Sequence, residues 1–338
     1  MWGRLTHTDR LRTYPGTYGQ HNGIFILFST TNIAITSAQI TLMAGSPSPG
    51  RKVDNESAKL NEMAKLLAMT EEDAPYVEDK WMMRRHLRAD KGKVASAAKR
   101  FRVTLEWRKS FGVLDLLECF RDRNPNPKIK ALEEILVHEN STGKIYTRGM
   151  DRFGRAIMIM RPQCENTKSH DNQMKHLVWN LEKAIATSKK NTLCCDGDGD
   201  GAWEEKIVIM FDYNEYKLSS APPMRTAKET ISILQNHYPE RLFKAYFIRA
   251  PLIFRGFFKI VSPFIDPVSK EKLNFLKGGA GESGLEEEFE SGELETFAGG
   301  VGGNYGRKNE KFDSSVHMRE LPFGCGLEME KEAEKEGN

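Results

Sequence analysis

The chain has 338 residues, of which 39% are hydrophobic and 29% charged, so it can bury one large core or two modest ones. Its formal net charge of +3 is close to neutral and gives no global argument for nucleic-acid binding. The five cysteines are odd in number and form no CxxC pair or metal-ligand spacing. A reducing compartment therefore fits them best.

Residues 1–50 lack the pattern of a folded unit and are expected to form a disordered extension. Three arginines, Arg4, Arg10 and Arg12, stand against the single Asp9, which is also typical of a transit peptide. The run 24–43 has the length of a membrane span, but its many Ser and Thr residues make it too polar. A targeting peptide, a membrane span and a wrongly predicted first exon remain the alternatives.

Residues 51–125 have the pattern of a small helical subdomain. Apolar residues recur at helical spacing in the first segment, at Leu60, Met63, Leu66 and Leu67. Two more helices are expected over 80–89 and 94–111. Between residues 80 and 110, eleven Lys or Arg residues stand against two acidic ones. This excess indicates either a solvated helical face or a contact with an anionic membrane.

Residues 131–278 alternate between helical and strand patterns. Helices are expected over 131–138, 171–190 and 222–237, and strands over 144–148, 156–160, 207–211 and 244–249. This alternation predicts an α/β fold in which helices pack on a mostly parallel or mixed sheet.

Two acidic, glycine-rich segments interrupt or follow this pattern. Within the insertion 191–205, residues 196–201 match the first six places of a calcium-binding EF-hand loop, but the twelfth place is Ile207 instead of Glu. An exposed acidic loop is therefore the preferred interpretation. The segment 279–303 holds seven Glu and eight Gly, so it and the tail to residue 338 are predicted to be largely disordered.

The stretch 237–276 holds the unusual chemistry. A helix is expected between Pro251 and Pro263 whose residues are nearly all apolar, apart from Arg255 and Lys259. Such a helix is either deeply buried or meets lipid. The Asp266-Pro267 step then opens a second helix with a hydroxyl and an ammonium, Ser269 and Lys272, near an N-terminus suited to a phosphate.

The order of these elements resembles the CRAL-TRIO family of phosphatidylinositol-transfer proteins. The resemblance rests on the turn 238–241 (Tyr-Pro-Glu-Arg), a strand, Ala250-Pro251, the aromatic helix and the motif 264–268 (Phe-Ile-Asp-Pro-Val), within residues 80–278. The motifs 161–162, 166–170 and 176–179 are similar to the fungal pleiotropic-drug-resistance branch. The resemblance implies a helical N-terminal subdomain, a sheet floor and an apolar gate helix.

The resemblance also implies the binding residues. Those for the lipid headgroup are Glu240, Arg241, Ser269 and Lys272, and those for the gate and apolar pocket are Phe254, Phe257, Phe258, Phe264, Ile207 and Ile209. Two departures stand out. Asp90 replaces a family Arg, and Ile207 and Ile209 stand where founding members carry the Ser and Thr that bind phosphatidylcholine. The apolar pair argues against choline lipids and leaves room for a sterol or another apolar lipid.

We therefore expect a non-catalytic protein that extracts phosphatidylinositol and exchanges it between membranes, with no cofactor, metal or nucleic acid. A membrane-associated lipid-sensing scaffold is the alternative. A hydrolase would need Asp212 with one of His170, His176 or His237, but no nucleophile elbow or P-loop accompanies them. The expected protein is monomeric, cytoplasmic and peripheral at membranes such as the endoplasmic reticulum or lipid droplets.

Overall fold

The computed structural model describes residues 53–79, 81–120, 126–193, 206–217, 219, 221–277 and 285–301. Contacts divide the chain into two units, and the first, Met1–Ala34, lies outside the described residues. The expectations for residues 1–50 and for the EF-hand-like run 196–201 therefore fall outside the structure. None of the helices in the described ranges is long and apolar enough to cross a membrane.

The first described part is a small helical subdomain, as predicted. It contains α2 (Val53–Leu67), η1 (Ala74–Tyr76), α3 (Met82–Ala89), α4 (Val94–Phe111) and α5 (Val113–Glu118). The predicted apolar stripe of α2 is buried at Leu60, Met63 and Leu67, where it packs on α3 and α4, whereas Leu66 is 57% exposed. Hydrophobic packing of one helical face therefore holds this subdomain together.

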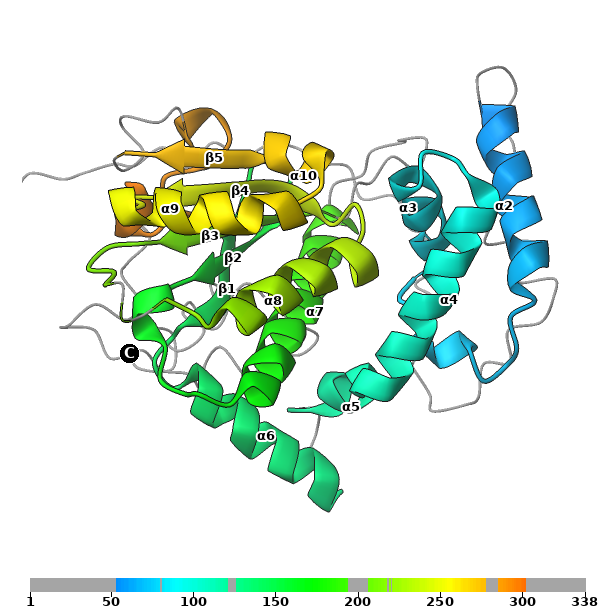
Figure 1. The fold of residues 1–338 in the computed structure, drawn as a ribbon, viewed down its shortest axis with the longest axis horizontal. Coiled ribbons are helices and arrows are strands. Elements are labelled where there is room, and N and C mark those ends of the chain that lie inside the picture. The colour runs from blue at the N-terminus through cyan, green and yellow to red at the C-terminus, as the bar shows by residue number, and fades with distance from the viewer. Residues whose placement is uncertain are drawn as a thin grey trace, which may run out of the picture. The chain divides into compact units, whose positions relative to one another are not determined.

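The second part is built on a five-stranded sheet with the order β1-β2-β3-β4-β5 (Figure 1). The strands are β1 (Ile145–Met150), β2 (Ala156–Met160), β3 (Ile207–Asp212), β4 (Leu242–Ile248) and β5 (Leu273–Leu276). Only the β1–β2 pair is antiparallel among these strands, and the three other pairs are parallel. The mixed α/β class is confirmed, although the short edge strand β5 was not predicted.

Helices connect the parallel strands, because parallel neighbours need crossover segments. The helices of this part are α6 (Pro127–Asn140), α7 (His170–Leu193), α8 (Met224–His237), α9 (Leu252–Val261) and α10 (Pro267–Glu271), with short turns η2 (Pro162–Cys164) and η4 (Ser262–Phe264). The chain passes from β2 to β3 through α7, from β3 to β4 through α8, and from β4 to β5 through α9 and α10.

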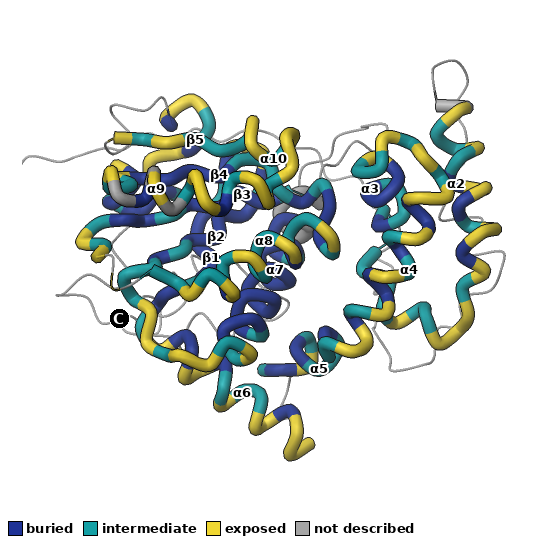
Figure 2. The backbone as a smooth tube through the Cα atoms, in the orientation of Figure 1, coloured by how far each residue is buried: buried dark blue, intermediate teal, exposed yellow. Residues whose placement is uncertain are grey.

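Alternation along the strands gives the sheet two apolar faces. Ile207 and Ile209 of β3 belong to one core, which includes α7, α8 and α9, whereas Val208 and Met210 belong to a second core. We call the first the cavity face and the second the strap face. Both faces are covered, so β2 and β3 are mostly buried, whereas the edge strand β5 is intermediate or exposed (Figure 2).

Residues 285–301, here called the strap, cover the second face, so the prediction of disorder for 279–303 is wrong for these residues. The strap contains η6 (Leu285–Glu287) and η7 (Thr296–Ala298). Its buried apolar residues pack on the sheet: Leu285, Phe289, Leu294, Phe297 and Ala298. The high content of Glu and Gly indicated a solvated segment, because composition alone does not show that the carboxylates have hydrogen-bond partners on the sheet.

Those carboxylates bind the sheet directly. The Tyr146 hydroxyl donates to both oxygens of Glu295 at 2.8 and 2.9 Å, and the Met150 amide donates to Glu293 at 3.0 Å. Gly149 has a φ of +73°, and a Cβ built there would lie 2.1 Å from the Glu293 carbonyl oxygen. The strap therefore approaches β1 too closely for any residue but glycine.

Candidate functional site

Two adjoining cavities lie on the cavity face of the sheet. The gate cavity, of about 230 Å³, reaches α9, and the mouth cavity, of about 550 Å³, reaches α10 and the turn before β4. They share six wall residues: Phe211, Thr230, Ile231, Leu234, Phe247 and Ile265. The shared wall makes them two chambers of one hollow between the sheet and α8.

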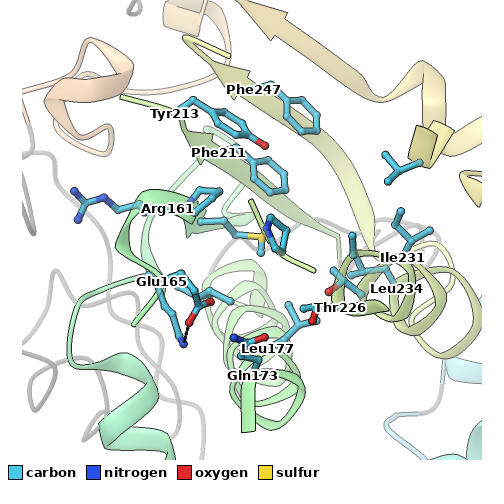
Figure 3. Close-up of a pocket in the computed structure, with 18 of the residues that line it drawn as sticks. Arg161, Glu165, Gln173, Leu177, Phe211, Tyr213, Thr226, Ile231, Leu234 and Phe247 are labelled. Atoms are coloured by element: carbon cyan, nitrogen blue, oxygen red, sulfur yellow. Dashed lines mark hydrogen bonds and ion pairs between the residues drawn. The ribbon is translucent and has the colours of Figure 1, made fainter. Parts of the chain in front are cut away.

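Aromatic rings form one wall of the gate cavity (Figure 3). The rings of Phe211 and Phe247 stack with centroids 4.6 Å apart, and Phe254 of α9 lies 4.7 Å from Tyr213. Figure 3 shows Phe211, Tyr213 and Phe247 on the strand side, and Leu177 and Ile231 on helices opposite them. This chamber is suited to apolar chains.

The gate residues expected from the sequence separate into three groups. Phe254 is buried and Phe258 half-buried, and both line the gate cavity. The side chain of Phe257 lies outside the described part of the structure. Phe264 does not line either cavity; it is 45% exposed, with the Lys228 ammonium 4.5 Å above its ring.

The gate helix α9 is apolar on two sides. Phe254 and Val261 face the core, whereas Leu252 and Ile260 are 75% and 57% exposed. Pro251 is its N-cap, and Pro263 falls in η4, where the α-helix has already ended. The sequence predicted that this helix is either deeply buried or in contact with lipid. The described side chains form both a buried face and an exposed apolar face.

Polar side chains gather at the mouth cavity. Glu240, Ser269 and Lys272, which the resemblance implied as headgroup ligands, all line it: Glu240 comes from the turn before β4, Ser269 lies in α10 and Lys272 is the C-cap of α10. The Asp266 carboxylate caps α10 by accepting from the Ser269 amide at 2.9 Å. Because α10 has only five residues, its dipole contributes little, and the side chains provide the charge.

Arg241 has a different environment from the one expected for a headgroup ligand. Its side chain is 2% exposed, and its guanidinium donates to Glu78 and, at 2.7 Å, to Asp79. Arg85 of α3 donates to the same two carboxylates at 3.1 and 2.9 Å. Arg241 is therefore held by the helical subdomain, although it borders the mouth cavity.

Three cations of the helical subdomain also line the mouth: Arg88, Lys91 and Arg100. Arg88 pairs with Glu56 at 2.9 Å, and Arg100 pairs at 2.8 Å with Asp90, the residue that replaces the family Arg. Sequence reasoning found the basic excess of residues 80–110 but not which of its members face the site. Their long separation from residues 240–272 along the chain concealed that proximity.

Ile207 and Ile209 lie in the wall of the mouth cavity and are 1% and 3% exposed. At the far end of the gate cavity, Lys144 is buried but paired with Glu139 and, at 2.7 Å, with Glu165. The cation is compensated by its own neighbours. The interior of the hollow is therefore apolar between two polar ends.

The candidate catalytic groups do not converge. The Asp212 carboxylate lies 3.6 Å from Arg161 and accepts from the Asn214 amide at 2.9 Å. His170 contacts Thr226 and Glu229, whereas His237 stacks on Trp107 with centroids 4.1 Å apart. Burial lowers the pKa of His176 well below its usual range. Among the described residues, no group of three or more His, Cys, Asp or Glu side chains is placed to hold a metal.

A family model and several known proteins match this chain in sequence. Residues 140–300 match the model of the CRAL/TRIO domain. The chain is 36% identical over 203 residues to a CRAL-TRIO domain-containing protein of Schizosaccharomyces pombe, covering 59% of this chain and 18% of that protein. It is 32% identical over 204 residues to the phosphatidylinositol transfer protein PDR17 of Saccharomyces cerevisiae, covering 58% of this chain and 53% of the relative.

A third relative is aligned over more of its length. The SEC14 cytosolic factor of Kluyveromyces lactis is 27% identical over 259 residues, covering 75% of this chain and 81% of that protein. The crystal structure of Sfh5 superposes with a TM-score of 0.56 at 15% identity, covering 85% of this chain and all of that chain, which shows the fold alone. The chain spans less than two thirds of the first two relatives.

Proposed function

Because the chain carries a CRAL/TRIO domain, we propose that it binds phosphatidylinositol and moves it between membranes without catalysing a reaction. The observation that carries this proposal is the hollow on the cavity face, which is apolar between two polar ends, one of them formed by Glu240, Ser269 and Lys272. A two-chain lipid needs both features, since each acyl methylene removed from a bilayer costs about 0.8 kcal/mol unless an apolar wall replaces it.

The mouth provides chemistry for an inositol phosphate. The Glu240 carboxylate accepts hydrogen bonds from inositol hydroxyls, while the Lys272 ammonium and the Ser269 hydroxyl donate to the phosphate. Lys91 adds positive charge from the helical subdomain. Arg100 also lines the mouth, but Asp90 compensates its charge in the pair at 2.8 Å.

The isoleucine wall favours inositol over choline lipids. Ile207 and Ile209 offer no donor to a choline phosphate, and leaving such a phosphate unpaired in an apolar wall is costly. The same wall accepts a sterol or another apolar lipid as an alternative cargo. We expect phosphatidylcholine to be transferred at least about tenfold more slowly than phosphatidylinositol.

The gate helix α9 has a surface suited to contact with a membrane. Leu252 and Ile260 present apolar side chains on the outside of α9. We propose that this surface enters the lipid interface of a membrane while α9 moves to admit the acyl chains. The protein would then work as a monomer at the cytoplasmic surface of membranes such as the endoplasmic reticulum or lipid droplets.

The test is transfer of labelled phosphatidylinositol from donor to acceptor vesicles of phosphatidylcholine. The double variant Glu240→Ala/Lys272→Ala should reduce transfer to the spontaneous rate without lowering the unfolding temperature. The matched control is Lys270→Ala/Glu271→Ala, which alters neighbouring exposed charges that do not line either cavity. Normal transfer by the first variant would refute the headgroup assignment, and lipid binding without transfer by the wild type would favour a lipid-sensing scaffold.

A further inference from the structure

Glu240 has an unusual backbone conformation at the mouth cavity. Its φ is +61°, in the left-handed region that residues other than glycine, asparagine and aspartate rarely adopt. Such a conformation persists only where the neighbouring structure determines it. The residues on either side of Glu240 therefore hold it in this conformation.

Both flanking sides of the turn are anchored by buried carboxylates. Before Glu240, the Tyr238 hydroxyl donates to Glu182 at 2.7 Å, and the same Glu182 oxygen accepts from Arg108 of α4 at 2.6 Å. After it, the Arg241 guanidinium binds Glu78 and Asp79, as described above. The turn is thus held on one side through α7 and on the other by the segment that precedes α3.

Backbone bonds complete the clamp. The Arg241 amide donates to the Tyr238 carbonyl at 3.3 Å across the turn, and the Ile207 amide donates to the Arg241 carbonyl at 2.7 Å. The backbone of Arg241 is therefore joined to β3, while its side chain is joined to the helical subdomain. Glu240 therefore lies between Tyr238 and Arg241, which are both held, and it lines the mouth.

We propose that Arg241 is a positioning residue: Glu78 and Asp79 hold its guanidinium, and this anchor fixes Glu240 in the left-handed conformation that directs its carboxylate to the lipid headgroup. This inference rests on the proposed function and replaces the expectation that Arg241 binds the headgroup itself. It gives the helical subdomain a role in headgroup selectivity, since Glu78, Asp79 and Arg85 belong to that subdomain.

The charges of this cluster support an anchor. Two carboxylates face two guanidiniums, so the group is neutral as a whole, and the side chains of Glu78, Asp79, Arg85 and Arg241 are at most 13% exposed. Removing one charged partner of a buried, hydrogen-bonded group leaves the others uncompensated. The four side chains therefore have one favoured geometry, which allows them to fix the orientation of the neighbouring Glu240.

The test uses the variant Glu78→Gln/Asp79→Asn, which removes the anchor's charge while keeping the shape of both side chains. Two affinities are measured by titration with phosphatidylcholine vesicles that contain either phosphatidylinositol or dioleoylglycerol. We expect phosphatidylinositol affinity to fall about tenfold and dioleoylglycerol affinity to stay unchanged, because only the first lipid has the headgroup that Glu240 meets. In a Glu240→Ala background, the same double substitution should not lower the phosphatidylinositol affinity any further.

The control is Asp73→Asn, which breaks the 2.7 Å pair with Arg102 elsewhere in the same subdomain and should alter neither affinity. Equal loss for both lipids, or full additivity with Glu240→Ala, would show a merely structural role and overturn the inference. If the double variant does not fold, Glu78→Gln alone decides by the same two criteria. A wild type that shows no preference for phosphatidylinositol over dioleoylglycerol would instead contradict the proposed function.

Discussion

The two faces of the sheet are covered in different ways. On the strap face, five buried apolar residues of the strap pack on β1 to β4. The buried Glu295 and the half-buried Glu288 accept hydrogen bonds from tyrosine hydroxyls. On the cavity face, helices α7, α8 and α9 stand over β3 and β4 and leave chambers of about 230 and 550 Å³. The same strand, β3, contributes alternate residues to both.

This difference separates stability from function. Protein interiors are normally packed without voids larger than a water molecule, so a hollow of this size loses packing that the rest of the fold must supply. The strap face provides a filled core directly behind the hollow. Changes on the strap face should therefore alter the free energy of unfolding, and changes on the cavity face should alter lipid binding.

The largest effect is expected from Phe297→Ala on the strap face. Phe297 is 2% exposed, and truncating a buried phenylalanine lowers the free energy of unfolding by about 3 to 5 kcal/mol. Denaturant unfolding measures this loss, with Val301→Ala, at a 75% exposed position of the same strap, as the control. A loss below about 1 kcal/mol, closer to the effect of a surface substitution, would mean that the strap is not part of the core.

A second strap-face effect depends on pH. Burial raises the pKa of Glu295 from 4.5 to about 8, so the folded state keeps its proton at pH values where the unfolded chain loses it. The stability from this proton is complete below pH 4.5 and is lost as pH rises toward 8. Relative to Glu295→Gln, the wild type should lose more than about 1.4 kcal/mol, the equivalent of one pKa unit, between pH 5 and 8.

Chemical denaturation of both proteins across this pH range provides the measurement. The Tyr146 hydroxyl, whose pKa is itself raised by burial, stays neutral throughout and is not a competing source of the slope. Parallel curves for the wild type and Glu295→Gln would show that Glu295 does not hold a proton in the folded state.

On the cavity face, Thr230→Phe should reduce lipid binding without a comparable loss of stability. Thr230 lines both chambers, so a larger side chain there fills space that acyl chains would occupy. We expect phosphatidylinositol affinity to fall about tenfold, with the free energy of unfolding changed by less than about 1 kcal/mol. Vesicle titration measures the affinity, and denaturant unfolding of the same sample measures the stability. A loss of stability with intact lipid binding would contradict the assignment of binding to the cavity face.

The smallest effect is expected at the gate surface. Ile260 is 57% exposed, and replacing it with Asp should weaken association with vesicles about fivefold, because a charge would have to enter the lipid interface. Val137→Asp, at a 41% exposed position on α6, is the control. Sedimentation with vesicles measures both, and equal binding by the two variants would exclude α9 as the membrane contact.

Periodicity predicted the fold well where burial follows a regular pattern. The strand 156–160 and the helix 94–111 have the predicted bounds, because each has a clear apolar face and, for the helix, Gly112 in a left-handed C-cap. The strap was missed because its five apolar residues follow no helical or strand period. Its glutamates resembled a solvated segment, although three of them bind the sheet.

The binding role of the site residues stays a prediction, but the structure brings three of them together. Glu240, Ser269 and Lys272, which the resemblance implied as headgroup ligands, line one cavity, since motif spacing reflects a shared backbone path. Arg241 was assigned to the headgroup because the sequence does not show that Glu78 and Asp79, more than 160 residues earlier, reach its guanidinium. Contacts of such long separation depend on tertiary packing, which local pattern does not encode.

The most direct test of the central claim is mass spectrometry of the lipid that copurifies with the intact chain. The wild type should carry phosphatidylinositol in near-stoichiometric amount, and Glu240→Ala/Lys272→Ala should carry little of it while remaining folded, because the hollow on the cavity face would lack its headgroup contacts. A wild type free of phosphatidylinositol after exposure to membranes that contain it, or a variant that retains the same amount, would contradict the account.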